Sequence, residues 1–259
     1  MLAVVSPAKK LNFSQPAIAH GRSTPVFLKQ ADELAKVAKK LTRADLRQLM
    51  HLSENLADLN YDRFQRFTPS PAEEATKQAA LAFAGDTYAG LDAASLDQND
   101  MAFAQNNFRI LSGLYGLLRP LDAIQPYRLE MGRKLTNPRG EDLYDFWGTS
   151  VAHALDEQLA DHKSQTIINL ASNEYFKVID KKALKADVLN IVFKEERDGV
   201  LKIISFFAKK ARGAMARHII KNRLETPDGL KDFIAEGYAY QPALSTKTDW
   251  VFTRKPQAV

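Results

Sequence analysis

The sequence predicts an α+β fold in which a central sheet is combined with many helices, and three observations lead to this prediction. Apolar, β-branched runs occur near both ends of the chain and in its middle, at Leu2–Ser6, Thr166–Leu170 and Trp250–Phe252. Two more such runs flank Asp198 and Gly199, a pair that favours a tight hairpin turn. Apolar residues at helical spacing fill much of the chain between these strands. Because the strands come from both ends and the middle, we expect one mixed domain over residues 1–259.

Residues 28–67 are expected to form three short helices. Helical spacing of apolar residues begins near Leu28, and Thr42 can cap a second helix that has Asp45 in its first turn. A third helix would begin at Ser53 and end before the sequence TPSP at residues 68–71.

The centre of the chain is expected to be mostly helical over residues 72–118, with breaks at Gly85 and Gly90. Pro120 and Pro126 interrupt any helix in residues 119–132, and a turn is expected at residues 137–140. Another helix is expected over residues 143–159. The second strand of the hairpin should give way to a helix after Phe207.

The composition excludes several kinds of chemistry. The 259 residues carry a formal net charge of +5 and contain no cysteine, which excludes disulfides, thiolate nucleophiles and cysteine-based metal sites. The five histidines never fall at metal-ligand spacing, and phosphate-binding glycine loops and nucleophile elbows are absent from the sequence. We therefore predict no metal and no cofactor. Without an apolar stretch long enough for a signal peptide or a membrane span, we expect a cytoplasmic protein that does not contact membranes.

The most unusual stretch is SFFAKKARGAMARHIIKNR at residues 205–223, which holds six Lys or Arg residues and no carboxylate. On a helix, apolar residues such as Met215 share an inward face, and Lys210, Arg217 and Lys221 fall on nearly the opposite face. That basic face is either an ordinary solvated surface or a ridge that faces phosphates, with Gly213 allowing a backbone to approach. A membrane-surface helix is a weaker alternative, because the apolar side lacks Trp, Phe and Leu.

A second set of cations lies in residues 39–66, where acids are interleaved with them. Within this set, residues 49–64 are expected to form two helices joined by a tight turn. The amide groups that open the second helix can hold a phosphate. Alternatively, Ser53 only caps an ordinary helical hairpin, and the residues alone favour this second interpretation.

Two polar segments offer candidates for a pocket. Four charged residues of alternating sign surround two prolines, and these are Arg119, Asp122, Arg128 and Glu130. They suit either a cleft that binds an anion and transfers protons or a set of internal ion pairs that fixes an irregular loop. Asn173 and Glu174 follow the strand at residues 166–170, a frequent place for site residues, although a helix cap explains Asn173 equally well.

Six stretches together resemble the YaaA family of bacterial proteins. They are SPAKKL, SGLYGLLRPLDAIQPYRLEMG, DLYDFWG, NLASNEYFK, ISFFAKKARGAMARHIIKNR and EGY, and they extend from Ser6 to Tyr238. The resemblance implies an α+β domain with a helix-hairpin-helix element and DNA binding through a positively charged cleft. It also implies a role in surviving hydrogen peroxide by limiting free intracellular iron. The family offers no catalytic residues to transfer.

On this sequence the helix-hairpin-helix element would lie within residues 44–64, with its hairpin at Leu52–Asn55, where LSEN lacks the usual glycine. The residues expected to contact DNA are Lys9, Lys10, Arg47, His51, Ser53, Asn55, Arg63, Lys209, Lys210, Arg212, Arg217, Lys221 and Arg223.

We therefore expect a monomeric protein of the peroxide response, without a protein partner, that binds duplex or branched DNA through its backbone and shape. The alternative is an enzyme acting on a nucleotide or nucleic acid through a polar pocket around Lys9, Arg119, Asp122, Arg128, Glu130 and Glu174, with Asn173 beside it. An iron-sequestering protein would fit the peroxide phenotype but lacks a ligand cluster. Carboxylates that converge on a pocket would favour the enzyme, and a basic cleft without them would favour binding alone.

Overall fold

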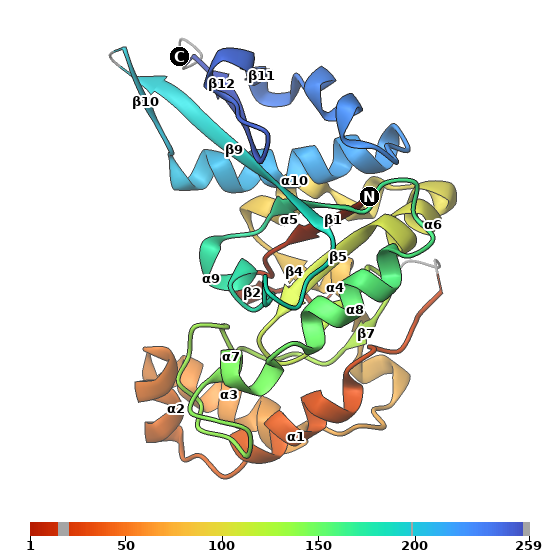
Figure 1. Cartoon of the computed structure of the whole chain (residues 1–259). Helices are drawn as coiled ribbons and strands as arrows, with labels where there is room; N and C mark the ends of the chain where they lie inside the picture. Colours follow the sequence, from red (N-terminus) through yellow and green to blue (C-terminus); the bar gives the residue numbers. More distant parts are fainter. Residues whose placement is uncertain (15–20, 198, 256–259) are drawn as a thin grey trace.

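The computed structural model describes residues 1–14, 21–197 and 199–255. Their largest sheet has eight strands, which confirms the predicted mixed fold with a central sheet (Figure 1). Its order is β11–β12–β9–β8–β1–β5–β6, and β10 pairs with β9. The strands are β1 Leu2–Val5, β5 Phe108–Ser112, β6 Gly116–Leu118, β8 Thr166–Leu170, β9 Asp187–Arg197, β10 Val200–Lys202, β11 Ala239–Tyr240 and β12 Asp249–Arg254.

The five strands β12, β9, β8, β1 and β5 run parallel, and antiparallel strands flank them. All four residues of β1 are buried, as expected for a strand that has neighbours on both edges and elements on both faces. From β1 the chain reaches β5 on one side of it, and then returns to β8 on the other side. The carboxyl ends of β1 and β8 therefore form a topological switch point, where α/β sheets commonly bind ligands.

The three helices predicted in residues 28–67 are confirmed as α1 Leu28–Ala38, α2 Arg43–Met50 and α3 Glu54–Arg66. Thr42 caps α2 as predicted, and Asp45 returns a hydrogen bond to the Thr42 backbone in a capping box. In Figure 1 these helices and α7 gather at the end of the molecule opposite β10 and β12.

The prediction of a mostly helical segment over residues 72–118 is wrong after Asn107. The helices α4 Ala79–Ala82, α5 Asp86–Leu91 and α6 Gln98–Asn107 form, but β5 and β6 follow. Short strands also occur, with β2 Lys10–Leu11 paired to β4 Phe83–Ala84 and β3 Lys77–Gln78 paired to β7 Ala123–Ile124. A short apolar run such as that of β5 is compatible with either a buried strand or a buried helix, and its pairing with β1 decides.

Two other helix boundaries differ from the prediction. The helix expected over residues 143–159 divides into α7 Leu143–Trp147 and α8 Ser150–Leu159, because Gly148 adopts a φ of 47° between them. The hairpin of β9 and β10 is confirmed, with Asp198 outside the described residues, but its second strand ends at Lys202. Helix α10 Ser205–Lys221 begins at Ser205 rather than after Phe207.

The remaining elements are short. They are α9 Asn173–Phe176 and the 3-10 turns η1 Glu73–Ala75, η2 Ala93–Ser95, η3 Pro227–Asp232, η4 Ala235–Gly237 and η5 Pro242–Leu244.

Helix α10 is the central packing element of the fold. It contacts β1, β8 and β9 of the sheet as well as α5 and α6. Gly90 of α5 and Gly213 of α10 lie where the two helices cross, and a Cβ atom on either would meet the backbone of the other helix. The predicted helix break at Gly90 is therefore wrong, because Gly90 lies inside α5. Gly213 does allow a backbone to approach, but it is the backbone of α5.

The EGY motif has a structural role near the chain's C-terminal strand. Buried Glu195 accepts hydrogen bonds from Arg254, at 2.9 Å, and from the Tyr238 hydroxyl, at 3.3 Å. Arg254 also donates to the carbonyl oxygen of Glu236 at 3.0 Å. Burial, together with the neighbouring carboxylate of Glu195, raises the pKa of Tyr238 to about 12. The motif thus links β9, β12 and the segment before β11.

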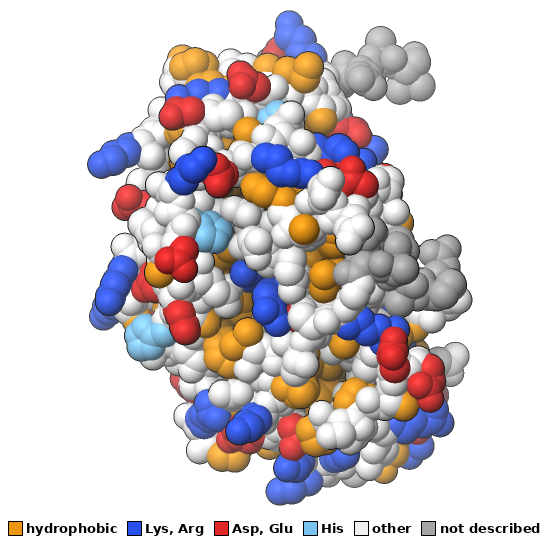
Figure 2. Space-filling model, turned by 90° about the vertical axis from the view of Figure 1, so that its right-hand side faces the viewer, with side chains coloured by type: hydrophobic (Ala, Val, Ile, Leu, Met, Phe, Trp, Pro, Cys, Tyr) orange, Lys and Arg blue, Asp and Glu red, His pale blue; other side chains and the backbone are white. Residues whose placement is uncertain are grey.

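On the face shown in Figure 2, Lys and Arg side chains lie interspersed with Asp and Glu side chains. Within the described ranges, we find no helix whose length and apolar character suit a membrane crossing.

Candidate functional site

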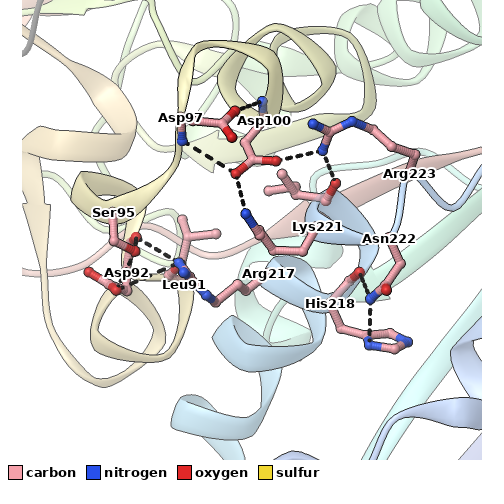
Figure 3. A network of polar contacts seen from close by, with 11 residues as sticks. Leu91, Asp92, Ser95, Asp97, Asp100, Arg217, His218, Lys221, Asn222 and Arg223 are labelled. Carbon is pink, nitrogen blue, oxygen red and sulfur yellow. Dashed lines mark hydrogen bonds and ion pairs between the residues drawn. The ribbon is translucent and has the colours of Figure 1, made fainter.

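The basic face predicted on α10 is largely held by partners inside the fold. Lys210 Nζ lies 2.9 Å from a carboxylate oxygen of Glu236. Arg217 donates hydrogen bonds to the carbonyl oxygens of Leu91, at 3.1 Å, and Asp92, at 2.9 Å, both at the end of α5 (Figure 3). These two cations therefore tie α10 to neighbouring segments.

Lys221 and Arg223 share the buried carboxylate of Asp100 on α6 (Figure 3). Each cation lies 2.7 Å from one of the two Asp100 oxygens, and the Asp100 side chain is only 2% exposed. Burial opposes the charge of Asp100, but hydrogen bonds from Lys221, Arg223 and the Asp97 backbone outweigh it and lower the pKa of Asp100 to about 2. The pairing is a strong internal one.

The predicted helix pair of residues 44–64 is present as α2 and α3, but its turn differs in detail. His51, with a φ of 52°, is the residue in the left-handed region, and it ends α2 just before the expected hairpin at Leu52–Asn55. Because the reversal occurs at His51, LSEN does not need a glycine. Ser53 precedes α3 without a side-chain capping bond, and Arg47 pairs with Glu54 at 3.0 Å. The assignment of α2 and α3 as a helix-hairpin-helix element remains a prediction.

A cavity of about 470 Å³ lies at the switch point between β1 and β8, where residues of β2, β4 and α9 also line it. Five parts of the chain supply its polar walls: residues 6–10 after β1, residues 84–88 at the start of α5, Ser172 with Glu174 and Tyr175 after β8, α10 through Lys209 and Arg212, and Glu130. The hydroxyl of Ser6 joins the first and third parts, because it accepts from the Ser172 amide at 2.9 Å. The cavity is thus built from segments that are far apart in the sequence.

Glu130 is the most buried charged group of this cavity, with a side chain 4% exposed. Its Oε1 atom is 3.2 Å from Arg128, 3.3 Å from Lys9 and 3.5 Å from Arg133. Burial opposes ionisation, but these three cations hold the pKa of Glu130 below its usual range. Glu130 is therefore an anion at neutral pH.

Polar atoms without a partner among the described residues belong to two residues that line the cavity and to Arg128, which contacts Glu130. They are Oε2 of Glu130, Nε of Arg128 and Nε of Arg212, and all three are buried. Burial lowers the pKa of Arg212, because an apolar environment disfavours its charged form. Burial, followed by the positive charge of Arg128, also lowers the pKa of Arg63 on α3, which places Arg63 near this cluster.

Glu174 completes the polar lining from the start of α9. Its Oε1 atom accepts a hydrogen bond from the Gly132 amide at 3.0 Å, and its own carbonyl oxygen accepts one from the Tyr144 hydroxyl at 2.8 Å. The neighbouring Asn173 is exposed and does not line the cavity.

The six residues of the predicted pocket divide into two groups. The structure brings Lys9, Arg128, Glu130 and Glu174 together, whereas Arg119 and Asp122 do not line the cavity. Asp122 is fully buried and accepts hydrogen bonds from the Ser23 hydroxyl, at 2.7 Å, and from Arg119, at 3.0 Å. Burial raises the pKa of Asp122 despite these bonds. Arg119 and Asp122 thus form an internal ion pair that fixes the loop, which was one of the two interpretations of this segment.

Sequence reasoning missed Arg133 and the two phenols that line the cavity, Tyr88 and Tyr175. Arg133 stands three residues after Glu130, a spacing that suits a local ion pair and that could have suggested it. No sequence pattern indicated the two tyrosines, because only the tertiary fold brings them together. Over the described ranges, no group of three or more His, Asp or Glu side chains is placed to hold a metal ion.

Comparison with known proteins identifies the family. A family model described as peroxide stress protein YaaA matches residues 1–244. The chain belongs to this family. Membership supports a role in peroxide stress.

Relatives of similar length accompany this match. A UPF0246 protein of Caulobacter vibrioides strain NA1000 / CB15N is 52% identical over 254 residues, covering 98% of this chain and 99% of the relative. One from Caulobacter sp. strain K31 is 54% identical over 254 residues, with the same coverage. One from Saccharophagus degradans strain 2-40 is 51% identical over 255 residues, covering 98% of this chain and all of the relative.

Proposed function

We propose that this protein acts in the peroxide response by binding duplex or branched DNA, and that the mouth of the switch-point cavity contacts the backbone phosphates. Family membership supports the role in the peroxide response. The observation that carries the phosphate contacts is the convergence of Lys9, Lys10 and Lys209, which are exposed and come from two distant segments around one cavity.

These lysines are better placed for phosphates than the paired cations of α10. In the described part of the chain, no carboxylate forms an ion pair with Lys10 or Lys209, and Lys9 shares Glu130 with two arginines. Phosphates bound by such lysines release counterions, so affinity falls with salt. Lys221 or Arg223 would first have to leave the buried Asp100 carboxylate, which costs free energy. We therefore assign the phosphate contacts to Lys9, Lys10 and Lys209.

The connection between α2 and α3 provides a second candidate contact. Arg47, His51, Ser53 and Asn55 are all exposed there. Ser53 makes no side-chain capping bond, so its hydroxyl is available to a phosphate oxygen. We propose that this surface contributes to DNA binding, while Arg63 lies inward near Arg128.

Protection from peroxide would be indirect, because the chain has no cysteine to react with peroxide. We propose that it helps limit free intracellular iron through its DNA complex rather than through a metal site of its own described residues.

The test is DNA affinity with a matched control. A variant with Lys9, Lys10 and Lys209 changed to Gln is compared with one in which Lys36, Lys163 and Lys231 are changed to Gln. The control lysines are also exposed, but each forms an ion pair with a carboxylate and none of them lines the cavity. We expect the first variant to lose at least about tenfold in affinity for unrelated duplex sequences, and the control to lose little. Equal losses of DNA affinity in the two variants would contradict the placement of the phosphate contacts at the cavity mouth. Binding to one DNA sequence only would contradict recognition through the DNA backbone.

A cellular test uses a bacterium that lacks its own member of this family. Wild type and the control variant should restore survival in hydrogen peroxide, and the Lys9, Lys10 and Lys209 variant should not. Full restoration by that variant would separate peroxide resistance from DNA binding.

A further inference from the structure

The interior of the switch-point cavity holds polar atoms that the described fold does not use. Glu130 presents Oε1 to three cations and leaves the buried Oε2 atom without a partner among the described residues. Nε of Arg212 is also buried and unpartnered there. Buried polar atoms in folded proteins nearly always have partners, so unused ones beside a cavity point to a bound molecule.

The two atoms require opposite chemistry in that molecule. Arg212 and the neighbouring Lys209 come from α10 and offer hydrogen-bond donors with positive charge, which suit a phosphate. Glu130 comes from the loop after β7 and offers a carboxylate oxygen, which accepts a hydrogen bond from an amino or N–H group. Inorganic phosphate alone satisfies only the first requirement.

The remaining lining suits a planar ring. Tyr88 and Tyr175 both line the cavity, and aromatic side chains favour contacts with other ring systems. The volume of about 470 Å³ lies within the range of cavities that bind small molecules and cofactors.

We propose that this cavity binds one nucleoside phosphate, with its phosphate on Arg212 and Lys209 and the amino group of its base donating to Oε2 of Glu130. Adenine, cytosine and guanine carry such an amino group. Thymine presents carbonyl oxygens on both sides of its single N–H group, and these repel a carboxylate. The site therefore discriminates against thymidine phosphates.

This inference goes beyond duplex binding, although it rests on the same cavity being a binding site. The nucleoside phosphate has two possible sources, a free nucleotide or an unpaired nucleotide of a bound DNA strand. Glu130 and Glu174 converge on this cavity, which is the arrangement that the enzymatic alternative requires. Binding of the nucleoside phosphate would be the first step of such a reaction.

The test is calorimetric titration of the full chain with dAMP, dCMP, dTMP and inorganic phosphate. We expect dAMP and dCMP to bind at least about tenfold more tightly than dTMP or inorganic phosphate. Arg212→Gln should lower the affinity for every nucleotide by at least about tenfold, whereas the exposed control Lys36→Gln should leave these affinities unchanged. No binding of any nucleotide up to millimolar concentration, or binding unaffected by Arg212→Gln, would overturn the proposal.

The role of Glu130 is tested from the ligand side as well, because Glu130→Gln removes the partner of three cations and threatens the fold. AMP is compared with purine riboside monophosphate, which lacks the amino group. Equal affinity of the wild type for both would overturn the assignment to Glu130, and weaker binding of the analogue supports it.

Duplex and single-stranded DNA, titrated on the same samples, separate the two sources and the two proposals. Competition between single-stranded DNA and dAMP identifies a strand nucleotide, and its absence identifies a free nucleotide, so both results support the site. Mononucleotide binding without any duplex binding would contradict the proposed function alone.

Discussion

A Cβ atom placed on Gly213 of α10 would lie 1.8 Å from the carbonyl oxygen of Thr87 on α5. Such a contact is impossible, so the two helices cross at this distance only because residue 213 has no side chain. The crossing in turn brings Arg217 to the end of α5. Gly213 in the basic stretch thus serves helix packing.

We expect Gly213→Ala to lower the free energy of unfolding by about 2–4 kcal/mol, because the helices must separate to admit one methyl group. Chemical denaturation measures the change. Lys209→Ala, on an exposed position of the same helix, is the control and should stay within about 0.5 kcal/mol of wild type. A Gly213→Ala variant of unchanged stability would contradict the close crossing.

Asp100→Asn tests the ion pairs at the end of α10. The folded pKa of Asp100, about 2, lies below its ordinary value of 3.8, so its charge stabilises the folded protein above the ordinary value and this stabilisation is lost as pH falls toward 2. At pH 7 the variant should lose roughly 1–3 kcal/mol. The difference from wild type should shrink below about pH 4. A loss that is independent of pH would show that the charge of Asp100 is unimportant.

Two charge reversals on α10 should have opposite consequences. Lys221→Glu places a second carboxylate beside buried Asp100 and should lower the free energy of unfolding by about 2–4 kcal/mol. Lys209→Glu lies at the cavity mouth and should weaken DNA binding while changing stability by no more than about 0.5 kcal/mol. Thermal unfolding and DNA affinity are measured on both variants. A stable Lys221→Glu variant that no longer binds DNA would instead support the interpretation of the basic face of α10 as a ridge that faces phosphates.

His51→Gly tests the turn between α2 and α3. His51 adopts a left-handed φ of 52°, which glycine adopts without steric cost, so the change should raise the free energy of unfolding by about 0.5–1 kcal/mol. Ser53→Gly is the matched control, because Ser53 is extended and gains nothing from glycine. If both variants are destabilised equally, the assigned turn geometry is wrong.

Local patterns predicted the parts of the fold that depend on local interactions. Thr42 and Asp45 are three residues apart, and their capping box follows from that spacing. The strand at Thr166–Leu170 is likewise visible as a short β-branched run. In contrast, β5 has the same apolar character as a buried helix, and only its pairing with β1, more than a hundred residues away, distinguishes the two.

The candidate site depended even more on distant partners. Lys221 and Asp100 are 121 residues apart in sequence, so the acid-free run at residues 205–223 gave no sign that its cations were already paired. Asp122 and Glu130 share one segment and similar neighbours, yet one fixes a loop and the other lines the cavity. Charge pattern alone does not determine which way each side chain points.

The salt dependence of DNA binding is the decisive measurement of whether phosphates are bound at the cavity mouth. Each lost phosphate contact makes the slope of log affinity against log salt shallower by roughly one unit. For the variant with Lys9, Lys10 and Lys209 changed to Gln, we expect a slope shallower by about two to three units, with the fold intact. A slope equal to that of the wild type would contradict phosphate binding at the cavity mouth.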